Sequence, residues 1–329
     1  MNNAINDYSI SILIPTYNQI NYISDAIESA LLQDYSNIEI LVLDDCSTDG
    51  TNEYIKSKYK DSRLHIIYNE NNLGRVKNYR KALELASGNW IINLDGDDYF
   101  TNPHYLSSAM AAIMEYPELV LVFGKRYIDY NGLIKPDLHT NRNKNLSKIL
   151  DGNTVFLKLA NTEIVINHMT CVYRRDLAIK LSFYRYDIIS SDWESVYRLV
   201  IGNKVCFLDE YCGAWRKHNN NTSRIFNEKE LINNYKLCTS LFLTAKTSKE
   251  FSSDILSKWF RNFTTMKLKN DINTVSKFGS FYSLSRIIIE VFSISSYSVF
   301  DAIFSISMIK SILRLFKRSI IFLNNIVNY

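Results

Sequence analysis

Short runs of apolar and β-branched residues alternate along the chain with segments in which apolar residues recur every three or four positions. The short runs are typical of buried strands, and the second spacing is typical of amphipathic helices. A polar, Asn-rich stretch at 136–147 predicts a mobile surface loop. We expect strands at 9–15, 38–43, 65–68, 90–94, 119–124, 170–173 and 204–208. We expect helices at 23–31, 54–59, 76–86 and 192–200, and further helices after residue 222. Because strands and helices alternate with short connections, the sequence predicts an α/β fold with a mostly parallel central sheet flanked by helices.

Charge and proline content divide the chain near residue 220. Residues 1–220 contain 23 Lys+Arg and 27 Asp+Glu, whereas residues 221–329 contain 15 and 7, so the second part is basic. All four prolines lie at or before Pro136, which leaves the second part without the strongest helix breaker. We therefore predict a catalytic domain at 1–222 and a helical C-terminal region at 223–329.

The cysteines and the N-terminal segment indicate the cellular compartment of the catalytic part. None of the five cysteines forms a Cys-x-x-Cys pair or a metal-like spacing, so we expect free thiols in a reducing environment. Residues 1–8 are polar and lack the basic and apolar parts of a secretion signal. These features predict a cytoplasmic location for the catalytic part.

Carboxylates follow two of the predicted strands. Asp95, Asp97 and Asp98 come after the strand at 90–94, and Asp45 follows the second strand. Ligands of open α/β sheets bind at the carboxyl ends of the strands, so we expect these acids to meet. Oxygen ligands suit Mg²⁺ or Mn²⁺ bound together with substrate phosphates, and a solvated acidic turn is the alternative. The chain has neither GxGxxG nor GxxxxGK, which argues against NAD enzymes and P-loop ATPases.

Several motifs follow one another along the first part of the chain. They are Ile14-Pro15-Thr16-Tyr17-Asn18, Asp44-Asp45-Cys46-Ser47-Thr48-Asp49-Gly50-Thr51, Asn72-Leu73-Gly74 with Asn78, Leu94-Asp95-Gly96-Asp97-Asp98, Ser191-Asp192-Trp193-Glu194 and Trp215-Arg216-Lys217-His218. In this order, over about residues 8–222, the chain resembles the family-2 glycosyltransferases, whose catalytic domain has the GT-A fold. One such motif would be a weak signal, whereas the whole series is a specific one.

The resemblance implies roles for these residues. Asp97 and His218 would bind the metal, Asp95 would touch the ribose or the metal, and Asp45 would hydrogen-bond the base of a sugar nucleotide. Arg75 and Lys77, beside Gly74, are two further cations that could bind phosphate. The residues expected to bind the nucleotide sugar are Pro15, Thr16, Tyr17, Asn18, Asp45, Gly74, Arg75, Lys77, Asn78, Asp95, Arg216 and His218.

Asp192 matches the acid that the family uses as general base. The family usually has a second acid immediately before it, where this chain has Ser191, so a second carboxylate is missing unless Glu194 serves. Asp192 also suits the N-cap of the helix that follows, and the sequence leaves both interpretations open. With a single base and no carboxylate pair for a covalent intermediate, the resemblance implies direct displacement with inversion.

The resemblance therefore implies an inverting, metal-dependent glycosyltransferase. It would move a sugar from a nucleotide diphosphate to a glycan or lipid-linked glycan in surface polysaccharide biosynthesis, with no nucleic-acid partner. A nucleotidyltransferase is an alternative that lacks its basic Gly-rich phosphate loop here, and a non-catalytic nucleotide-sugar or glycan-binding module is another. The sequence leaves the sugar, the nucleotide, the linkage and the oligomeric state open.

The C-terminal segment 285–329 combines apolar residues with a group of cations near its end: Lys310, Arg314, Lys317 and Arg318. No apolar run in it reaches the ~20 residues that a spanning helix needs. A basic amphipathic helix suits a surface of anionic lipid headgroups, and the alternative is a helical appendage packed on the catalytic domain or on another subunit. The first interpretation predicts a location at the inner face of the cell membrane.

Overall fold

The protein is described by a computed structural model that covers residues 8–218, 221, 227–303, 311 and 314. Its contacts divide the chain into two compact units. The first contains Met1–Phe156, Glu163–Asp187 and Ser191–His218, and the second contains Leu157–Thr162, Ile188–Ser190 and Asn219–Tyr329. The sheet belongs to the first unit, and helices dominate the second.

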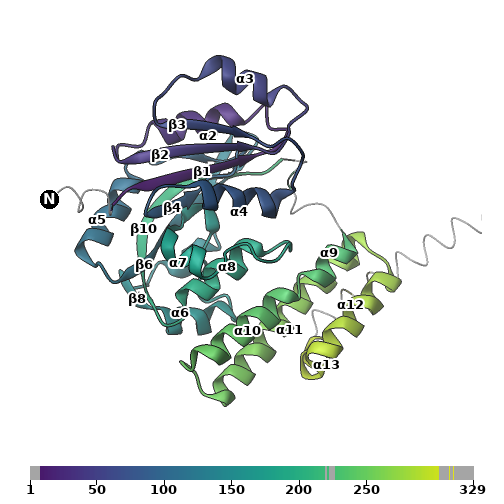
Figure 1. Ribbon diagram of the computed structural model, residues 1–329. Helices are drawn as coiled ribbons and strands as arrows, with labels where there is room; N and C mark the ends of the chain where they lie inside the picture. The colour runs from purple at the N-terminus through teal and green to yellow at the C-terminus, as the bar shows by residue number, and fades with distance from the viewer. Residues whose placement is uncertain (1–7, 219–220, 222–226, 304–310, 312–313, 315–329) are drawn as a thin grey trace, which may run out of the picture. The chain divides into compact units, whose positions relative to one another are not determined.

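The first unit is built on one sheet. Its strands in the described residues are β1 Ile10–Thr16, β2 Ile38–Asp44, β3 Leu64–Tyr68, β4 Trp90–Asn93, β5 Tyr99–Phe100, β6 Leu119–Tyr130, β7 Leu133–Pro136, β8 Ile149–Asp151, β9 Val172–Arg174 and β10 Lys204–Arg216. The order is β3-β2-β1-β4-β9-β6-β10-β5, and Figure 1 shows the first four of these in sequence from the top of the view. Strands β3, β2, β1 and β4 pair in parallel, as do β6 and β10, while β9 is antiparallel to both its neighbours. The predicted mostly parallel sheet is confirmed.

Helices of the predicted spacing accompany the strands. They are α2 Ile23–Leu31, α3 Thr51–Lys58, α4 Arg75–Leu85, α5 Tyr105–Glu115, α6 Gly152–Leu159, α7 Arg175–Lys180 and α8 Ser191–Val200. In α2 the buried positions are Ile23, Ala26, Ile27 and Ala30, the three-and-four spacing that the sequence shows. The apolar faces of α2 and α5 join the strands in one continuous core.

The stretch at 136–147, predicted as a mobile surface loop, is largely exposed but contains ordered contacts. A 3₁₀ helix, Thr140–Asn143, lies in this stretch, and Asp137 is buried with its carboxylate 2.9 Å from Nε of Arg126. The side chain of Asn143 exchanges two hydrogen bonds with the backbone of Val165, at 2.7 and 3.0 Å. These contacts hold parts of the segment, and composition does not reveal such pairing.

The second unit contains the helices of the C-terminal region. They are α9 Glu228–Asn233, α10 Lys236–Ser248, α11 Ser253–Phe278, α12 Phe281–Ile294 and α13 Ser296–Ile303. The predicted helical C-terminal region is confirmed. Across the described residues, none of the helices has both the length and the apolar character needed to cross a membrane. Of the predicted basic amphipathic helix, Lys310, Lys317 and Arg318 lie outside the described residues.

Candidate active site

The carboxyl ends of β1, β2 and β4 meet at one edge of the sheet. Thr16 pairs with Asp44 in the parallel register of β1 and β2, and the amide of Asp45 donates to the carbonyl of Thr16 at 2.9 Å. On the other side of β1, the amide of Gly96 donates to the carbonyl of Pro15 at 3.2 Å. The two acidic loops therefore flank the loop that follows β1, as their positions after parallel strands lead one to expect.

Gly96 makes this approach possible. A Cβ atom at Gly96 would lie 2.3 Å from Oε1 of Gln19 and 2.8 Å from Oγ1 of Thr16, distances that no side chain can adopt without moving its neighbours. The Thr16 hydroxyl donates to the same Gln19 oxygen at 2.6 Å. The small residue between Asp95 and Asp97 thus serves the packing of the acidic loop against the β1 loop.

Two residues with left-handed backbone conformation lie in the loops after β1 and β2. Asn18 has φ 53° and Cys46 has φ 64°, a region that costs a residue with a Cβ atom about 1 kcal/mol or more. Hydrogen bonds between the loops hold them: the Asn18 amide donates to Oγ of Ser47, and its side-chain oxygen accepts from the amide of Thr48, both at 2.8 Å.

The predicted nucleotide-binding residues after β1 differ in accessibility. Pro15 and Thr16 are buried, whereas Tyr17 is 47% exposed and Asn18 is also exposed. Tyr17 and Asn18 are therefore the members of this group that reach the surface, and Pro15 and Thr16 shape the loop from beneath.

Asp45 organises the loop before α4. Its buried carboxylate accepts hydrogen bonds from Nδ2 of Asn69 (2.8 Å) and from the amides of Leu73 (2.8 Å) and Gly74 (2.9 Å). A carboxylate has about four acceptor positions, so these bonds leave room for about one more donor. The predicted contact with a donor group of a nucleotide base requires this remaining acceptor position.

Asn78 supports the same loop from inside. Its side-chain oxygen accepts from Asn69 at 2.9 Å, and its Nδ2 donates to the carbonyl of Leu43 at 3.0 Å. The side chain is 2% exposed, so both of its polar atoms serve the fold. Asn78 was predicted to bind the nucleotide sugar, and the structure places it behind the loop.

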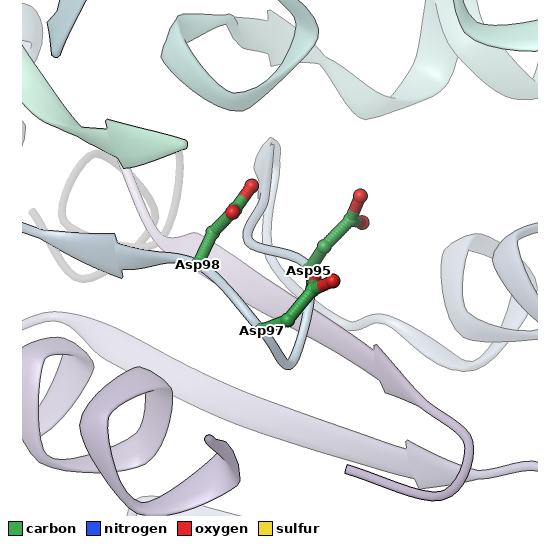
Figure 2. A group of neighbouring side chains, drawn as sticks. All are labelled: Asp95, Asp97 and Asp98. Carbon is green, nitrogen blue, oxygen red and sulfur yellow. The ribbon is translucent and has the colours of Figure 1, made fainter. Parts of the chain in front are cut away.

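Asp95, Asp97 and Asp98 form a compact acidic cluster between β4 and β5. Figure 2 shows the three side chains projecting from a single turn, and an oxygen from each lies within 4.8 Å of the others. Burial and the charge of Asp97 raise the pKa of Asp95 to about 7, against the hydrogen bond that Tyr79 donates to it. Burial and the charge of Asp97 also raise the pKa of Asp98 well above its usual range. Such crowding is the environment in which a divalent cation lowers the free energy of the ionised carboxylates.

The segment after β10 closes on this cluster. Nε2 of His218 lies 2.8 Å from Oδ2 of Asp97, and its ring stacks on Tyr22 with the centroids 4.7 Å apart. The backbone amide of Arg216 donates to Oδ1 of Asp98 at 2.9 Å. Asp98 is 3% exposed and holds the end of β10, whereas the side chains of Asp97 and His218 contact each other directly.

The guanidinium of Arg216 is held by acids of its own chain. It lies 2.6 Å from Asp25 at the start of α2 and 3.4 Å from Asp129 of β6. It also lies over the rings of Tyr22 and Tyr99, at 5.1 and 4.8 Å. In this state Arg216 neutralises two carboxylates, so a diphosphate would have to compete with Asp25 for it.

Of the two cations beside Gly74, Arg75 belongs to the acidic site. Burial disfavours the charge of its guanidinium, but Tyr79, Asp192 and Asp95 outweigh that effect and raise its pKa. Lys77 is exposed on α4. Arg75 therefore places a positive charge between the cluster and the segment that carries Asp192.

Asp192 lies within electrostatic range of the acidic cluster. Burial is the main cause of the raised pKa values of Asp95 and Tyr79, and the charge of Asp192 adds to both. It is the second residue of α8, inside the first turn and past the N-cap position that the sequence left open as an alternative.

Glu194 is not the second acid of the site. Its carboxylate is 1% exposed and lies 3.0 Å from Nε of Arg185 and 2.8 Å from Nε of Arg198. Ion pairs with two guanidinium groups direct this carboxylate into the protein and away from the acidic cluster. The interpretation in which Glu194 replaces the missing carboxylate at Ser191 is wrong.

Sequence reasoning missed a group of buried aromatic and polar residues around Asp95. They are Tyr79, Asn93, His168, Tyr173 and Tyr184. The Tyr79 hydroxyl donates to Asp95, and burial lowers the pKa of His168. Tyr79 lies at a core-facing position of α4, Asn93 ends β4, His168 begins a 3₁₀ helix, Tyr173 lies in β9 and Tyr184 lies between α7 and α8. No common spacing therefore distinguishes them from ordinary core residues.

Residues 11–181 match the family described as Glycosyl transferase family 2. The chain belongs to glycosyl transferase family 2. Among curated proteins, it is 38% identical over 125 residues to WfaP of Escherichia coli, named as a UDP-Glc:alpha-D-GlcNAc-diphosphoundecaprenol beta-1,3-glucosyltransferase, an alignment that covers 38% of this chain and 49% of WfaP. It is 26% identical over 232 residues to the glycosyltransferase GlyA of Streptococcus pneumoniae, over 68% of this chain and 32% of GlyA. The aligned segments thus span less than half the length of either relative.

Solved structures confirm the fold. Residues 1–349 of S. aureus TarS, in complex with UDP-GlcNAc, superpose on this chain with a TM-score of 0.67 at 20% identity, covering 86% of this chain and 79% of that one. The mannosyltransferase PcManGT of Pyrobaculum calidifontis, in complex with GDP-Man and Mn²⁺, gives a TM-score of 0.55 at 14% identity, covering 93% of this chain and 86% of that one. The GT-A fold implied by the motif series is confirmed.

Proposed function

We propose that this family-2 member is an inverting, metal-dependent glycosyltransferase that moves a sugar from a nucleotide diphosphate to a glycan or lipid-linked glycan acceptor. One observation carries the proposal. The acidic cluster meets His218 at the end of β4, with Nε2 of His218 2.8 Å from Oδ2 of Asp97, and the charge of Asp192 acts on Asp95 and Arg75. A base, an acidic cluster and a cation at one edge of the sheet form the set that glycosyl transfer from a diphosphate needs.

The acidic cluster fits Mg²⁺ or Mn²⁺. Asp97 and His218 would hold the ion, with Asp95 beside them, because carboxylate oxygens suit both ions and an imidazole is compatible with Mn²⁺. The raised pKa of Asp95 indicates negative charge that a cation would offset. When bound, the ion would stabilise the charge of the departing diphosphate.

The chain's own residues would perform the remaining steps. Asp192 accepts the proton of the acceptor hydroxyl as that oxygen forms its bond to the anomeric carbon from the face opposite the leaving group. Arg75 stabilises the negative charge on the diphosphate. Asp45 and the exposed Tyr17 and Asn18 hold the base and ribose, so that the anomeric carbon lies near the acceptor.

The substrates proposed rest on the names of related proteins. WfaP and WfgD of Escherichia coli, the second 42% identical over 94 residues, are both named for UDP-Glc and a diphosphoundecaprenol-linked acceptor. TarS is described in complex with UDP-GlcNAc. A UDP-sugar donor and a lipid-diphosphate-linked acceptor are therefore the first substrates to test.

We also propose that the C-terminal region contacts an anionic membrane surface at the cytoplasmic face. Large apolar side chains are exposed along α12 and α13: Tyr282, Ile289, Phe292, Tyr297 and Phe300. Residues 221–329 are basic, which suits anionic headgroups. A membrane contact would bring the enzyme to a lipid-linked acceptor.

The test combines turnover with binding. UDP-, GDP- and dTDP-sugars with Mn²⁺ or Mg²⁺ are first screened by thermal shift, because a ligand bound only by the folded state raises Tm. Transfer to a lipid-diphosphate-linked GlcNAc is then measured by mass spectrometry, and NMR of the product reports the anomeric configuration.

Two variants assign the base. Asp192→Asn is expected to lower kcat by at least about a hundredfold with donor binding retained. Asp209→Asn, at an exposed aspartate 2.7 Å from Lys125, is the control and should be active. Binding without transfer by the wild type, with every donor, would identify a binding module, and full activity of Asp192→Asn would remove the base assignment.

A further inference from the structure

Tyr184 lies between α7 and α8 with an unusual backbone conformation. Its φ is 58°, and Ser182, two residues earlier, has φ 52°. Tyr184 is fully buried. A residue with a Cβ atom stays in the left-handed region only when surrounding contacts hold it there, so those contacts indicate what the conformation serves.

The side chain of Tyr184 contacts the strand and helix that hold the acidic cluster. Its hydroxyl lies 3.1 Å from Oδ1 of Asn93, the last residue of β4, and 2.9 Å from Nε2 of His168. Its ring stacks on Tyr79 of α4, with centroids 5.3 Å apart and planes 23° apart. Tyr79 in turn donates its hydroxyl hydrogen to Asp95. Tyr184 thus reaches Asp95 from two directions, through the end of β4 and through Tyr79.

The backbone of Tyr184 contacts the helix that carries Asp192. Its amide donates to Oγ of Ser195 at 2.8 Å, and the Ser195 hydroxyl donates to the carbonyl of Ser191 at 2.7 Å. Ser191 and Ser195 lie on either side of Asp192 in the first turns of α8. On the other side, the Tyr184 carbonyl accepts from the guanidinium of Arg80 on α4. One residue therefore joins α4, β4 and the start of α8.

We propose that Tyr184 is a positioning residue that holds the first turn of α8, with Asp192, in register with the strand and helix that hold Asp95. This inference rests on the proposed function, in which Asp192 is the base and the cluster binds the diphosphate through a metal. Because Tyr184 is buried, it acts through Asp192 and Tyr79 and has no contact with substrate. Its loss should misplace the base while the nucleotide contacts at Asp45 persist.

Tyr184→Phe and Tyr184→Leu test the proposal. The Phe variant keeps the stacking on Tyr79 and loses the hydroxyl contacts, and the Leu variant loses both. We expect kcat to fall by about tenfold in Tyr184→Phe and about a hundredfold in Tyr184→Leu, the cost of a misplacement of about 1 Å. The donor KM should change by less than about twofold, since the nucleotide loops are untouched.

Tyr105→Phe is the matched control. Tyr105 is also fully buried, and its hydroxyl donates to the carbonyl of Thr170 at 2.6 Å, outside the contacts of Tyr184. A general loss of stability would lower Tm in both phenylalanine variants alike and leave kcat similar. Equal kcat in Tyr184→Phe and Tyr105→Phe, or a loss confined to the donor KM, would overturn the positioning role.

Hydrogen exchange provides a readout that does not depend on turnover. We compare amide hydrogen exchange at position 184 and in peptides covering 182–187 and 191–195. These amides should exchange at least about fivefold faster in Tyr184→Phe than in Tyr105→Phe, because the contacts that hold α8 are weakened. Unchanged exchange would reject the proposal. If the wild type transfers no sugar, the proposed function fails, and the exchange result still decides whether Tyr184 holds α8.

Discussion

Asp45→Asn separates the structural contribution of this residue from its proposed contact with the nucleotide. The Asp45 carboxylate accepts three hydrogen bonds, one of them at Oδ2 from the amide of Gly74. In Asp45→Asn, an NH₂ group replaces one charged oxygen and a neutral oxygen, a weaker acceptor, replaces the other. With the NH₂ group at the Oδ2 position, the Gly74 amide would face a second donor. Hydrogen bonds to a charged acceptor contribute roughly 1.5–3 kcal/mol each, and neutral ones roughly 0.5–1.5.

The loss of the hydrogen bond from Gly74 to Asp45 is partly offset because the Gly74 amide also lies 3.0 Å from Oδ1 of Asn72. With one acceptor removed and two weakened, we expect the free energy of unfolding to fall by about 2–3 kcal/mol. Urea unfolding measures this change as a lower midpoint with an unchanged m-value. Calorimetry on the folded variant should also show UDP binding weakened by at least about tenfold, the loss of one hydrogen bond to a charged group.

Asp49→Asn is the matched control for this prediction. Asp49 also accepts three hydrogen bonds, from the amide of Ile20 and from the amide and hydroxyl of Thr51, but it is exposed and lies two residues before the start of α3. Asparagine keeps an oxygen that can accept from Thr51 at this exposed position, so the change in the free energy of unfolding should be less than about 1 kcal/mol. Equal destabilisation by the two variants would refute the argument that burial and loop geometry make Asp45 special.

Further predictions concern the acidic site, α8 and the C-terminal region. Glu194→Gln leaves the buried charge of Arg198 without its carboxylate and should lower the free energy of unfolding, measured in urea, by about 3 kcal/mol. The control Glu28→Gln, at an exposed ion pair, should have little effect. Similar unfolding midpoints for the two variants would contradict a stabilising role of the buried pair. The raised pKa of Asp95 means that the metal-free folded state holds a proton that the unfolded chain releases, so its stability falls as pH rises from 3.8 to about 7. Mn²⁺ must displace that proton, so the increase in Tm that Mn²⁺ causes should be larger at pH 8 than at pH 6. This pH dependence of the increase in Tm should be smaller in Asp95→Asn. Equal increases at both pH values would argue against Asp95 as part of the metal site. Deletion of 285–329 should abolish sedimentation with anionic vesicles, with neutral vesicles as control, and unchanged sedimentation would reject the membrane proposal.

The sheet and its acidic edge could be predicted because they follow from local pattern and one topological rule. Apolar runs mark β1, β2 and β4, and parallel strands end at the same edge, so Asp45 and Asp95 had to approach each other. The motif series then added Asp192, whose approach to the cluster no pattern within α8 reveals. This part of the site is encoded in residues that stand at strand ends.

The direction of individual side chains could not be predicted in the same way. Glu194 stands in a motif beside the proposed base, yet two arginines fold over it, one of them nine residues earlier on an irregular segment. Asn78 has the position of a ligand in the motif series, but its amide faces inward to Asn69 and Leu43. Both partners of Asn78 and one of the two arginines that hold Glu194 belong to separate segments, so the outcome depends on tertiary packing as well as on the residue's own neighbours.

The acidic cluster and the base come from different parts of the chain, and transfer requires them to be fixed to within a fraction of an ångström. Parallel pairing fixes Asp95 relative to Asp45, but it places no constraint on α8, which is separated from β4 by the five strands β5 to β9 along the sequence. Contacts other than the sheet ladder must therefore set the distance from Asp192 to the cluster. Tyr184 makes such contacts, and its left-handed backbone indicates that the fold accepts a local cost to keep them.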